Sequence, residues 1–303
     1  MNVVLCGDID AAELAGWRVA LSGAMPEAAW LDAAQAGEPA TAVVAAVVAN
    51  PVPGSLRGIP NLRLIQSLWA GVDRLLADAS LPPDVPIARM VDPVMTAAMA
   101  QTALWAVLSL HRGFFDYAQQ QRRGQWLQRP QRRADEVQVL VLGRGEMGRA
   151  TASRLAEQGY RVQSWSRASS GSQPLAGLLH DAEIVVNLLP LTDATRGLLD
   201  AEFFAALPRG AALVNLARGA HVVEPDLLAA LDSGALRHAV LDVFASEPLP
   251  AGHSFWQHPA VTVLPHAAAM TDERSAAAVV AANLRALRDG APLSHLVDRN
   301  RGY

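Results

Sequence analysis

Short apolar runs alternate with longer stretches rich in Ala and Leu along most of the chain. In the first third, the apolar runs predict strands at residues 3–6, 41–48, 62–68 and 87–90. From residue 137 onward, six more runs predict strands at 137–142, 161–165, 184–188, 212–215, 239–242 and 261–264, with a helical stretch between each pair. Strands that alternate with helices favour a parallel sheet covered by helices. The pattern therefore predicts an α/β fold whose second part is a six-stranded doubly wound sheet.

Two long helical stretches suggest how the chain divides into domains. One covers about residues 95–112, and the other begins near Asp272, after the last predicted strand. We expect the final helix to return to the first domain. This predicts one domain of residues 1–93 and 275–303, with a second domain of residues 94–274 inserted in it; the motifs described below make the first the substrate domain and the second the dinucleotide-binding domain. An N-terminal domain simply followed by a C-terminal domain is the alternative that periodicity leaves open.

Composition narrows the class of protein. The 303 residues suffice for two domains, and 51% of them are hydrophobic against 18% charged. A formal net charge of −4 argues against a nucleic-acid surface. The single cysteine, Cys6, excludes an internal disulfide and fits a reducing compartment. We find no secretory signal and no apolar run that approaches the length of a membrane helix, so we expect a cytoplasmic protein that binds no membrane.

A glycine-rich turn joins the strand predicted at 137–142 to a helical stretch. It consists of Gly143, Arg144, Gly145, Glu146, Met147 and Gly148. In a dinucleotide fold the first glycine permits a tight turn, the second lets the backbone approach a pyrophosphate, and the third brings the helix close to the sheet. Amides at the helix start then attract a phosphate. The turn predicts a dinucleotide site, and a purely structural tight turn is the alternative.

The end of the next predicted strand indicates which dinucleotide is bound. NAD enzymes usually place Asp or Glu there, to bind the ribose 2′-hydroxyl. Here the strand is followed by Ser166 and Arg167, and then by Ser169 and Ser170. A guanidinium and hydroxyls suit a 2′-phosphate, whereas a carboxylate would repel it. We therefore expect NADPH to be preferred, with NADH possible; stacking of Arg167 on the adenine is the alternative.

Three candidate catalytic residues lie close after predicted strands. Arg218 presents a planar fork of donors that suits a carboxylate or a polarised carbonyl. Glu247 and His266 would form a pair in which the carboxylate stabilises the imidazolium, which can then donate a proton. Taken singly, a surface arginine and a structural histidine are the alternatives. The spacing of His253, His258 and His266 matches no zinc pattern, so we predict no metal site.

The local contexts of these residues resemble the D-isomer-specific 2-hydroxyacid dehydrogenase family. The segments concerned are Asn215-Leu-Ala-Arg218-Gly219, Asp242 to Pro248 and Pro265-His266. Residues 67–73 resemble the family's carboxylate-binding loop, and residues 189–195 its cofactor-side loop. The stretches 255–266 and 297–303 and the turn 165–167 are similar to the glyoxylate/hydroxypyruvate reductase A branch. The resemblance implies two Rossmann-like or flavodoxin-like domains.

The resemblance also implies a reaction, in which NADPH reduces glyoxylate to glycolate and hydroxypyruvate to D-glycerate. Arg218 would bind and polarise the small 2-oxo acid, His266 would protonate its carbonyl oxygen, and Glu247 would hold the imidazole. The substrate-binding loop would consist of Trp69, Ala70 and Gly71. Its backbone N–H groups would bind the substrate carboxylate, and the Trp69 side chain would form a wall of the pocket. An ordinary turn is the alternative for Gly71. Further cofactor contacts would come from Leu188, Pro190, Thr195, Ala217, Asp242 and Ala268.

For some residues the resemblance leaves more than one role open. Asp242 corresponds to a contact of the nicotinamide amide, and an N-cap of the next helix is its alternative. Gln101 stands where relatives often have Glu, and His266 is followed by Ala instead of a β-branched residue. Relatives are usually dimers built around the long helix, so we expect a homodimer. Trp126 would then lie in the interface or the core, or reach the partner's pocket.

Two other functions are compatible with the same motifs. One is the same chemistry on a bulkier 2-oxo acid. The other is a non-catalytic regulator of this fold that senses NAD(P). The presence of Arg218, Glu247 and His266 together favours an enzyme.

Overall fold

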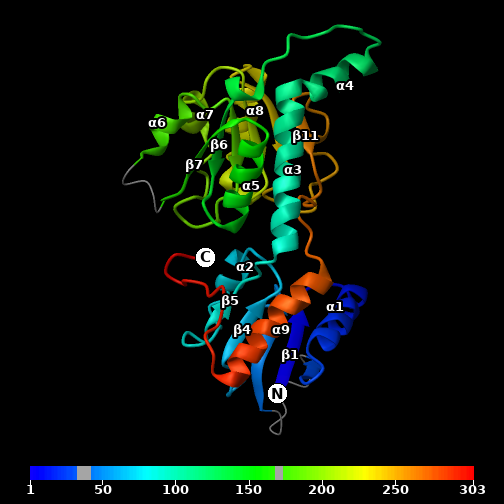
Figure 1. Cartoon of the computed structure of the whole chain (residues 1–303), viewed down its shortest axis with the longest axis vertical. Coiled ribbons are helices and arrows are strands. Elements are labelled where there is room, and N and C mark those ends of the chain that lie inside the picture. Colours follow the sequence, from blue (N-terminus) through cyan, green and yellow to red (C-terminus); the bar gives the residue numbers. More distant parts are fainter. Residues whose placement is uncertain (33–41, 168–172) are drawn as a thin grey trace. The chain divides into compact units, whose positions relative to one another are not determined.

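The computed structural model describes residues 1–32, 42–167 and 173–303. The first residue of the strand predicted at 41–48 lies outside this part of the chain, as do Ser169 and Ser170. Contacts divide the chain into two units (Figure 1). Unit 1 comprises Met1–Met95 and Thr271–Tyr303, and unit 2 comprises Thr96–Met270. Each unit is an α/β structure with a parallel sheet of its own.

Unit 1 is built on a five-stranded parallel sheet in the order β2-β1-β3-β4-β5. The strands are β1 Asn2–Gly7, β2 Ala29–Asp32, β3 Val43–Ala49, β4 Leu64–Ser67 and β5 Ile87–Ala88. The order is that of a flavodoxin-like sheet. β3 is almost wholly buried, as its continuous apolar sequence predicts, and β4 is buried although it contains Gln66 and Ser67. The pattern missed β2, a four-residue edge strand that is partly exposed.

In the described part of unit 1, three helices lie wholly within the unit. They are α1 Ala11–Ala24, α2 Asp73–Leu76 and α9 Glu273–Asp289. α1 and α9 pack together (Figure 1), and they are so close at Gly16 that a Cβ there would lie 2.8 Å from Glu273 Oε1. On α9, the buried Asn283 donates from Nδ2 to Gln66 Oε1 of β4 at 2.7 Å. These contacts hold the C-terminal helix on the N-terminal sheet.

Unit 2 contains the predicted six-stranded parallel sheet, in the order β11-β10-β9-β8-β6-β7. Its strands are β6 Gln138–Leu142, β7 Arg161–Trp165, β8 Ile184–Asn187, β9 Ala211–Asn215, β10 Leu236–Leu241 and β11 Val261–Val263. The chain changes direction across the sheet after β7, because β8 pairs with the opposite edge of β6. In open α/β sheets, ligands bind at the carboxyl ends of the strands near such a switch point.

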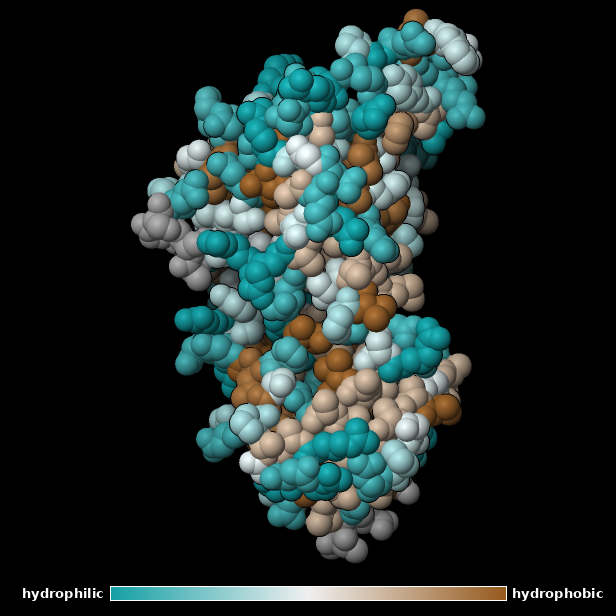
Figure 2. All heavy atoms as spheres, in the orientation of Figure 1, coloured by the Kyte–Doolittle hydropathy of each residue, from teal (hydrophilic) through white to brown (hydrophobic). Residues whose placement is uncertain are grey.

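The helices of unit 2 cover this sheet. They are α3 Pro93–Arg112, which begins in unit 1, α4 Phe114–Arg122, α5 Glu146–Glu157, α6 Leu175–Leu179, α7 Ala201–Ala205 and α8 Glu224–Asp232. Short 3-10 helices occur at Ala134–Glu136, Gly219–His221 and Ser254–Trp256. α4 contains no buried residue, and the face of it seen in Figure 2 is largely hydrophilic. The arginine-rich segment after it is exposed and is partly neutralised by ion pairs such as Arg129–Asp116 and Arg132–Glu183.

One expectation about α3 was wrong. Within the described residues, α3 is the one helix long and apolar enough to cross a membrane by length and composition. The expectation was that no apolar run approaches that length, and residues 93–112 are such a run. The apolar residues have another explanation, because Ala103, Ala106 and Val107 are buried in a core cluster with Val139 and Val141 of β6. A core helix passes the same test of composition as a membrane helix.

His238 of β10 is a buried histidine that links three elements of unit 2. Its ring stacks on Phe115 of α4, with centroids 4.4 Å apart, and its Nε2 lies 2.9 Å from Thr262 Oγ1 of β11. Burial, assisted by the charges of Arg237 and His258, lowers the pKa of His238 to about 4. The folded protein therefore keeps this ring neutral at a pH where the unfolded chain would protonate it.

We predict a loss of stability in mild acid that depends on His238. Because its pKa is about 4 when folded and about 6.5 when unfolded, the unfolded state binds the extra proton as the pH falls between these values. The loss should reach about 2 kcal/mol at pH 5 relative to pH 7.5. Urea unfolding of wild type and His238→Gln at both pH values measures it. Equal pH dependence in the two proteins would contradict the prediction.

Gly148 of α5 lies against the turn that precedes the helix. A Cβ at this position would lie 2.1 Å from the carbonyl oxygen of Gly143. Real atoms do not approach so closely, so α5 packs at this distance from the end of β6 only with glycine.

We predict that Gly148→Ala destabilises the fold by about 2–3 kcal/mol, because α5 must move away from β6. The matched control is Gly177→Ala in α6, where a Cβ would meet no atom of the described residues within 4 Å. That change should stabilise the protein by about 0.5–1 kcal/mol, since alanine is the better helix former. Urea unfolding measures both, and equal effects of the two substitutions would refute the packing argument.

Candidate active site

The carboxyl ends of three neighbouring strands carry the residues expected to do the chemistry. Arg218 follows β9, Glu247 follows β10 and His266 follows β11, and these strands are adjacent in the sheet. The structure brings Glu247 and His266 together, with Nδ1 of the ring 2.7 Å from Oε2 of the carboxylate. The other oxygen, Oε1, accepts a hydrogen bond from the backbone N–H of Phe244 at 2.9 Å.

This pair determines how the imidazole can act. A carboxylate only accepts hydrogen bonds, so Nδ1 of His266 carries a hydrogen and Nε2 is the atom that can exchange a proton with a substrate. The His266 side chain is 53% exposed and that of Glu247 is 35% exposed, so the pair lies at the surface of unit 2. The arrangement is that of a proton donor whose orientation is set by a carboxylate.

Asp242 holds the backbone on which His266 lies. Its carboxylate accepts hydrogen bonds from the N–H groups of Ala267 at 2.7 Å and Ala268 at 3.1 Å, and its carbonyl accepts from His266 N at 2.9 Å. Asp242 is 1% exposed. Burial raises the pKa of Asp242, and these amide hydrogen bonds and the nearby imidazole partly oppose that rise.

The same contacts explain an unusual backbone conformation. His266 has φ of +52°, in the left-handed region that residues other than glycine seldom adopt. Such conformations persist where surrounding contacts fix them, often at functional sites. Sequence reasoning missed this role of Asp242, and its alternative as a helix cap was wrong, because the next helix has His253 as its N-cap.

Arg218 begins the loop after β9, which lies directly against the loop that carries Glu247. A Cβ at Gly219 would lie 1.9 Å from the carbonyl carbon of Phe244, the residue whose N–H holds Glu247. The Arg218 side chain is half-buried, and its Nη1 donates to the carbonyl of Ala217 at 2.7 Å. Glycine at 219 therefore permits the contact between the two loops.

Two buried asparagines hold the loop that carries Arg218 by hydrogen bonds. Asn187, at the end of β8, donates from Nδ2 to Asn215 Oδ1 at 3.0 Å, and Asn215 donates from Nδ2 to the carbonyl of Arg218 at 3.0 Å. Asn187 Oδ1 accepts from the N–H of Leu189 at 3.2 Å. Sequence reasoning did not single out Asn187. The available signal was a polar residue at the end of a strand that is otherwise apolar.

The glycine turn has the geometry of a phosphate-binding turn. Gly143 has φ of +118°, and a Cβ there would lie 2.7 Å from the carbonyl oxygen of Leu188. Gly145 is the N-cap of α5; among the residues that the structure describes, no side chain caps that helix end and no atom lies within 4 Å of a Cβ built on Gly145. Packing requires glycine at 143 and 148 but leaves space beside Gly145, where a pyrophosphate would approach. Arg144 and Glu146 are exposed beside the turn, and Met147 is half-buried.

Arg167 connects the end of β7 to the loop after β8. Its guanidinium is exposed, and Nη1 donates to the carbonyl of Ala194 at 3.1 Å. Ser166, beside it, is half-buried. The guanidinium of Arg167 therefore contacts the loop of residues 189–195, which was predicted to lie beside the cofactor.

The loop of residues 188–195 is held by its own threonine. Thr195 is 2% exposed, and its hydroxyl donates to the carbonyl of Pro190 at 2.7 Å and accepts from Thr192 N at 2.9 Å. These bonds give Thr195 a part in shaping the loop. Leu188 N donates to the carbonyl of Leu142 at 2.7 Å, which fixes the start of the loop beside the glycine turn.

Two predicted cofactor residues are buried alanines. Ala217 is 7% exposed and Ala268 is 3% exposed. Ala268 N–H donates to Asp242, and its carbonyl accepts from Thr102 Oγ1 at 2.7 Å. Both of its backbone groups are thus used by the protein, and they fix the chain after His266.

The predicted substrate loop lies in unit 1, after β4. Trp69, Ala70 and Gly71 are half-buried, and Trp69 packs edge-on against Trp17 with ring centroids 6.1 Å apart. Trp69 N donates to Ser67 Oγ at 3.0 Å, and its carbonyl accepts from Met90 N at 3.0 Å. The N–H of Trp69 is therefore engaged within the loop, and the N–H groups of Ala70 and Gly71 stay the predicted contacts of the substrate carboxylate.

The three histidines considered for a metal site make separate pairs. His253 Nε2 lies 3.2 Å from Glu224 and His258 Nε2 lies 3.3 Å from Asp232, whereas His266 pairs with Glu247. Over the described ranges 1–32, 42–167 and 173–303, no group of three His, Cys, Asp or Glu side chains is placed to hold a metal ion.

Comparison with known proteins agrees with this geometry. Residues 104–268 match the family model for the NAD binding domain of D-isomer specific 2-hydroxyacid dehydrogenases. The chain is 38% identical over 304 residues to glyoxylate/hydroxypyruvate reductase A of Serratia proteamaculans (strain 568), an alignment that covers 95% of this chain and 96% of the relative.

Solved structures extend the similarity to the whole chain. A D-isomer specific 2-hydroxyacid dehydrogenase from Xanthobacter autotrophicus Py2, in complex with NADPH and MES, is 38% identical with a TM-score of 0.91, covering 100% of this chain and 99% of the other. The NADPH-dependent glyoxylate/hydroxypyruvate reductase of Sinorhizobium meliloti, in complex with NADP and sulfate, is 32% identical with a TM-score of 0.88, again covering 100% and 99%. As its motifs predicted, the chain belongs to the D-isomer specific 2-hydroxyacid dehydrogenase family.

Proposed function

We propose that this protein reduces glyoxylate to glycolate and hydroxypyruvate to D-glycerate with NADPH. The observation that carries the proposal is the His266–Glu247 pair, with 2.7 Å between Nδ1 and Oε2, next to the loop of Arg218 on a dinucleotide-type sheet. The similarity to glyoxylate/hydroxypyruvate reductase A of Serratia proteamaculans, which extends over 95% of this chain, supports this choice of substrates.

In the proposed reaction, Arg218, His266 and Glu247 each have a separate role. The guanidinium of Arg218 binds the 2-oxo acid and polarises its carbonyl, and NADPH supplies the hydride that the carbonyl carbon receives. The imidazolium of His266 gives the proton on Nε2 to the carbonyl oxygen and becomes neutral, keeping the hydrogen on Nδ1. Glu247 orients the ring and stabilises its charged form before the transfer.

NADPH fits the residues at the carboxyl ends of β6 and β7. The space beside Gly145 and the uncapped start of α5 suit a pyrophosphate, and we assign the 2′-phosphate to Arg167 and Ser166. We propose that the loop from Leu188 and Pro190 onward lines the cofactor. Two similar structures, from Xanthobacter autotrophicus Py2 and Sinorhizobium meliloti, were solved with NADPH or NADP.

The remaining assignments extend the proposal to the whole chain. Residues 94–274 form the dinucleotide-binding domain, and residues 1–93 with 275–303 form the substrate domain. There the N–H groups of Ala70 and Gly71 bind the substrate carboxylate, and the bulk of Trp69 favours small acids. We assign the enzyme to the cytoplasm.

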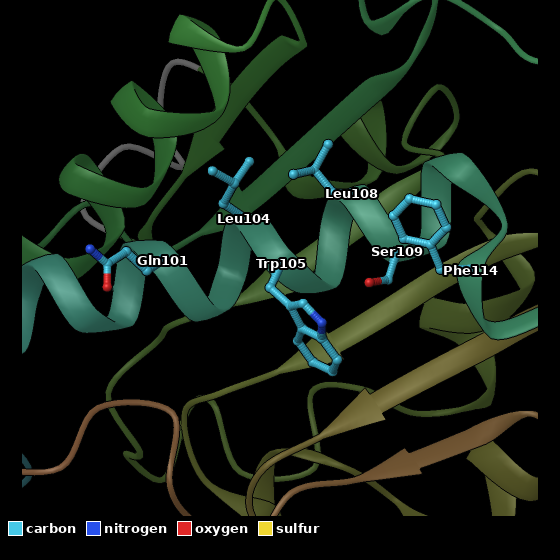
Figure 3. A pocket seen from close by; sticks show the side chains of 6 residues that line it. All are labelled: Gln101, Leu104, Trp105, Leu108, Ser109 and Phe114. Carbon is cyan, nitrogen blue, oxygen red and sulfur yellow. The ribbon is translucent and has the colours of Figure 1, made fainter. Parts of the chain in front are cut away.

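We also propose a homodimer, formed through the exposed apolar side of α3 and the start of α4. An open hollow of about 300 Å³ lies there, lined by Gln101, Leu104, Trp105, Leu108, Ser109 and Phe114 (Figure 3). Trp105 is 43% exposed and Phe114 is 54% exposed, although both are large apolar residues. A second copy of the chain would cover them. Trp126, 92% exposed, is another large apolar residue that we propose a partner covers.

A substrate panel tests the proposed function. NADPH oxidation is measured with glyoxylate, hydroxypyruvate, pyruvate and phenylpyruvate, and the series is repeated with NADH. Rapid turnover of the first two acids with NADPH is the expected result. Activity on phenylpyruvate alone would show that the enzyme has the same chemistry but acts on a bulkier 2-oxo acid. NADPH binding without turnover of any acid would instead favour a non-catalytic regulator.

We predict that His266→Gln lowers kcat for glyoxylate by about 10²–10⁴-fold, the usual contribution of a positioned general acid. Glu247→Gln should lower kcat by about 10–100-fold, because the imidazolium loses the charge that stabilises it. His253→Gln is the matched control, since His253 also pairs with a glutamate, Glu224, elsewhere in unit 2. Its kcat should stay close to that of wild type. A His266→Gln enzyme as active as the control would exclude His266 as proton donor.

We predict that Arg167→Ala raises the KM for NADPH by about 10-fold or more, the effect of losing one charge-assisted contact. The KM for NADH should change little, because NADH carries no 2′-phosphate. Arg154→Ala serves as control: Arg154 is an exposed residue of α5 that faces Glu157. Equal changes of the KM for both cofactors would favour stacking of Arg167 on the adenine over phosphate binding.

A further inference from the structure

His221 is a fully buried histidine between two loops of the candidate site. It lies in the 3-10 helix Gly219–His221, directly after Arg218, and is 0% exposed. Its Nδ1 lies 3.1 Å from the carbonyl oxygen of Arg218, and its Nε2 lies 3.3 Å from the carbonyl oxygen of Pro190. One ring therefore spans from the loop that carries Arg218 to the loop of residues 188–195, which contains the cofactor-side residues 189–195.

The chemistry of these contacts is directional. A carbonyl oxygen only accepts, so a ring nitrogen that bonds it must carry a hydrogen. An imidazolium bonds both carbonyls, and a neutral ring bonds one of them at a time. In either form the ring fills the buried space between the loops and fixes at least one of the two carbonyls.

Both carbonyls are also held from a second direction. Asn215 Nδ2 donates to the carbonyl of Arg218 at 3.0 Å, and Thr195 Oγ1 donates to the carbonyl of Pro190 at 2.7 Å. The backbone carbonyl of His221 itself accepts from Leu199 N at 2.9 Å. Each loop thus has its own anchor, and the His221 ring lies between the two anchored carbonyls, with one ring nitrogen within hydrogen-bond distance of each.

We propose that His221 is a positioning residue that couples the cofactor-side loop to Arg218, so that bound NADPH favours the arginine position that binds the 2-oxo acid. The inference rests on the proposed function, in which Arg218 binds the substrate and residues 188–195 line the cofactor. The coupling is reciprocal: a 2-oxo acid analogue strengthens NADPH binding by the same factor. His221 itself touches neither reactant in this scheme.

Three substitutions separate the two contacts. The amide nitrogen of Asn reaches about as far as Nδ1 and that of Gln about as far as Nε2, while Leu offers no donor. His221→Leu should raise the KM for glyoxylate and the KM for NADPH by about fivefold each, the effect of a lost hydrogen bond. His221→Asn should restore the glyoxylate KM, and His221→Gln the NADPH KM. A role in stability alone would lower the melting temperature without this split.

Coupling is measured directly with oxamate, an unreactive analogue of a 2-oxo acid. In wild type, oxamate should lower the Kd of NADPH by about fivefold, and in His221→Leu by less than about twofold. The matched control is His238→Leu, which removes another buried histidine of unit 2 and should keep the wild-type ratio. If His221→Leu does not fold, the Asn and Gln variants carry the test through the split in KM.

The outcomes distinguish the two proposals. A wild-type enzyme that turns over glyoxylate, with His221 variants that keep both KM values and the oxamate ratio, overturns the role of His221 and leaves the proposed function intact. A wild-type enzyme without any effect of oxamate also overturns it. A wild-type protein without turnover of any 2-oxo acid overturns the proposed function, and the inference about His221 with it.

Discussion

The hydrogen bonds from Ala267 and Ala268 to the buried carboxylate of Asp242 are the interaction on which the site depends. A buried carboxylate is costly unless donors surround it, and the turn at His266 brings both backbone N–H groups within hydrogen-bond distance of this one. The turn places His266 at φ +52° and directs its Nδ1 to Glu247. The position of the imidazole thus follows from satisfying one buried charge.

The other parts of the site follow from the parallel sheet. Asn187, Asn215 and Asp242 stand at or just after the ends of β8, β9 and β10, where neighbouring parallel strands present their carboxyl ends on one edge. Each side chain bonds the loop of its own strand or of the next one, so polar groups hold loops that carry no regular structure. The contact of Gly219 with the backbone of Phe244 adds a steric link between the Arg218 and Glu247 loops.

Much of this arrangement could be predicted from the sequence. Strands β6, β8 and β9 are largely apolar and buried, because both faces of the sheet are covered there. The motifs around Arg218, Glu247 and His266 identified the family. The four-residue strand β2 was missed because it is short and half-exposed. The amide contacts of Asp242, Thr195 and Trp69 could not be predicted, because they depend on the path of the backbone in loops and leave no periodic pattern.

The central claim is that the carboxylate of Asp242 positions His266. The most direct test is kcat for glyoxylate at saturating NADPH in Asp242→Asn, together with its melting temperature. The asparagine amide keeps the shape of the aspartate side chain. Its NH2 group is a donor, however, so it cannot accept a hydrogen bond from the backbone N–H group that it faces. We expect kcat to fall at least about tenfold, since a small displacement of a catalytic group is costly, with a KM for NADPH and a fold close to those of wild type. An unchanged kcat in a folded variant would contradict the account.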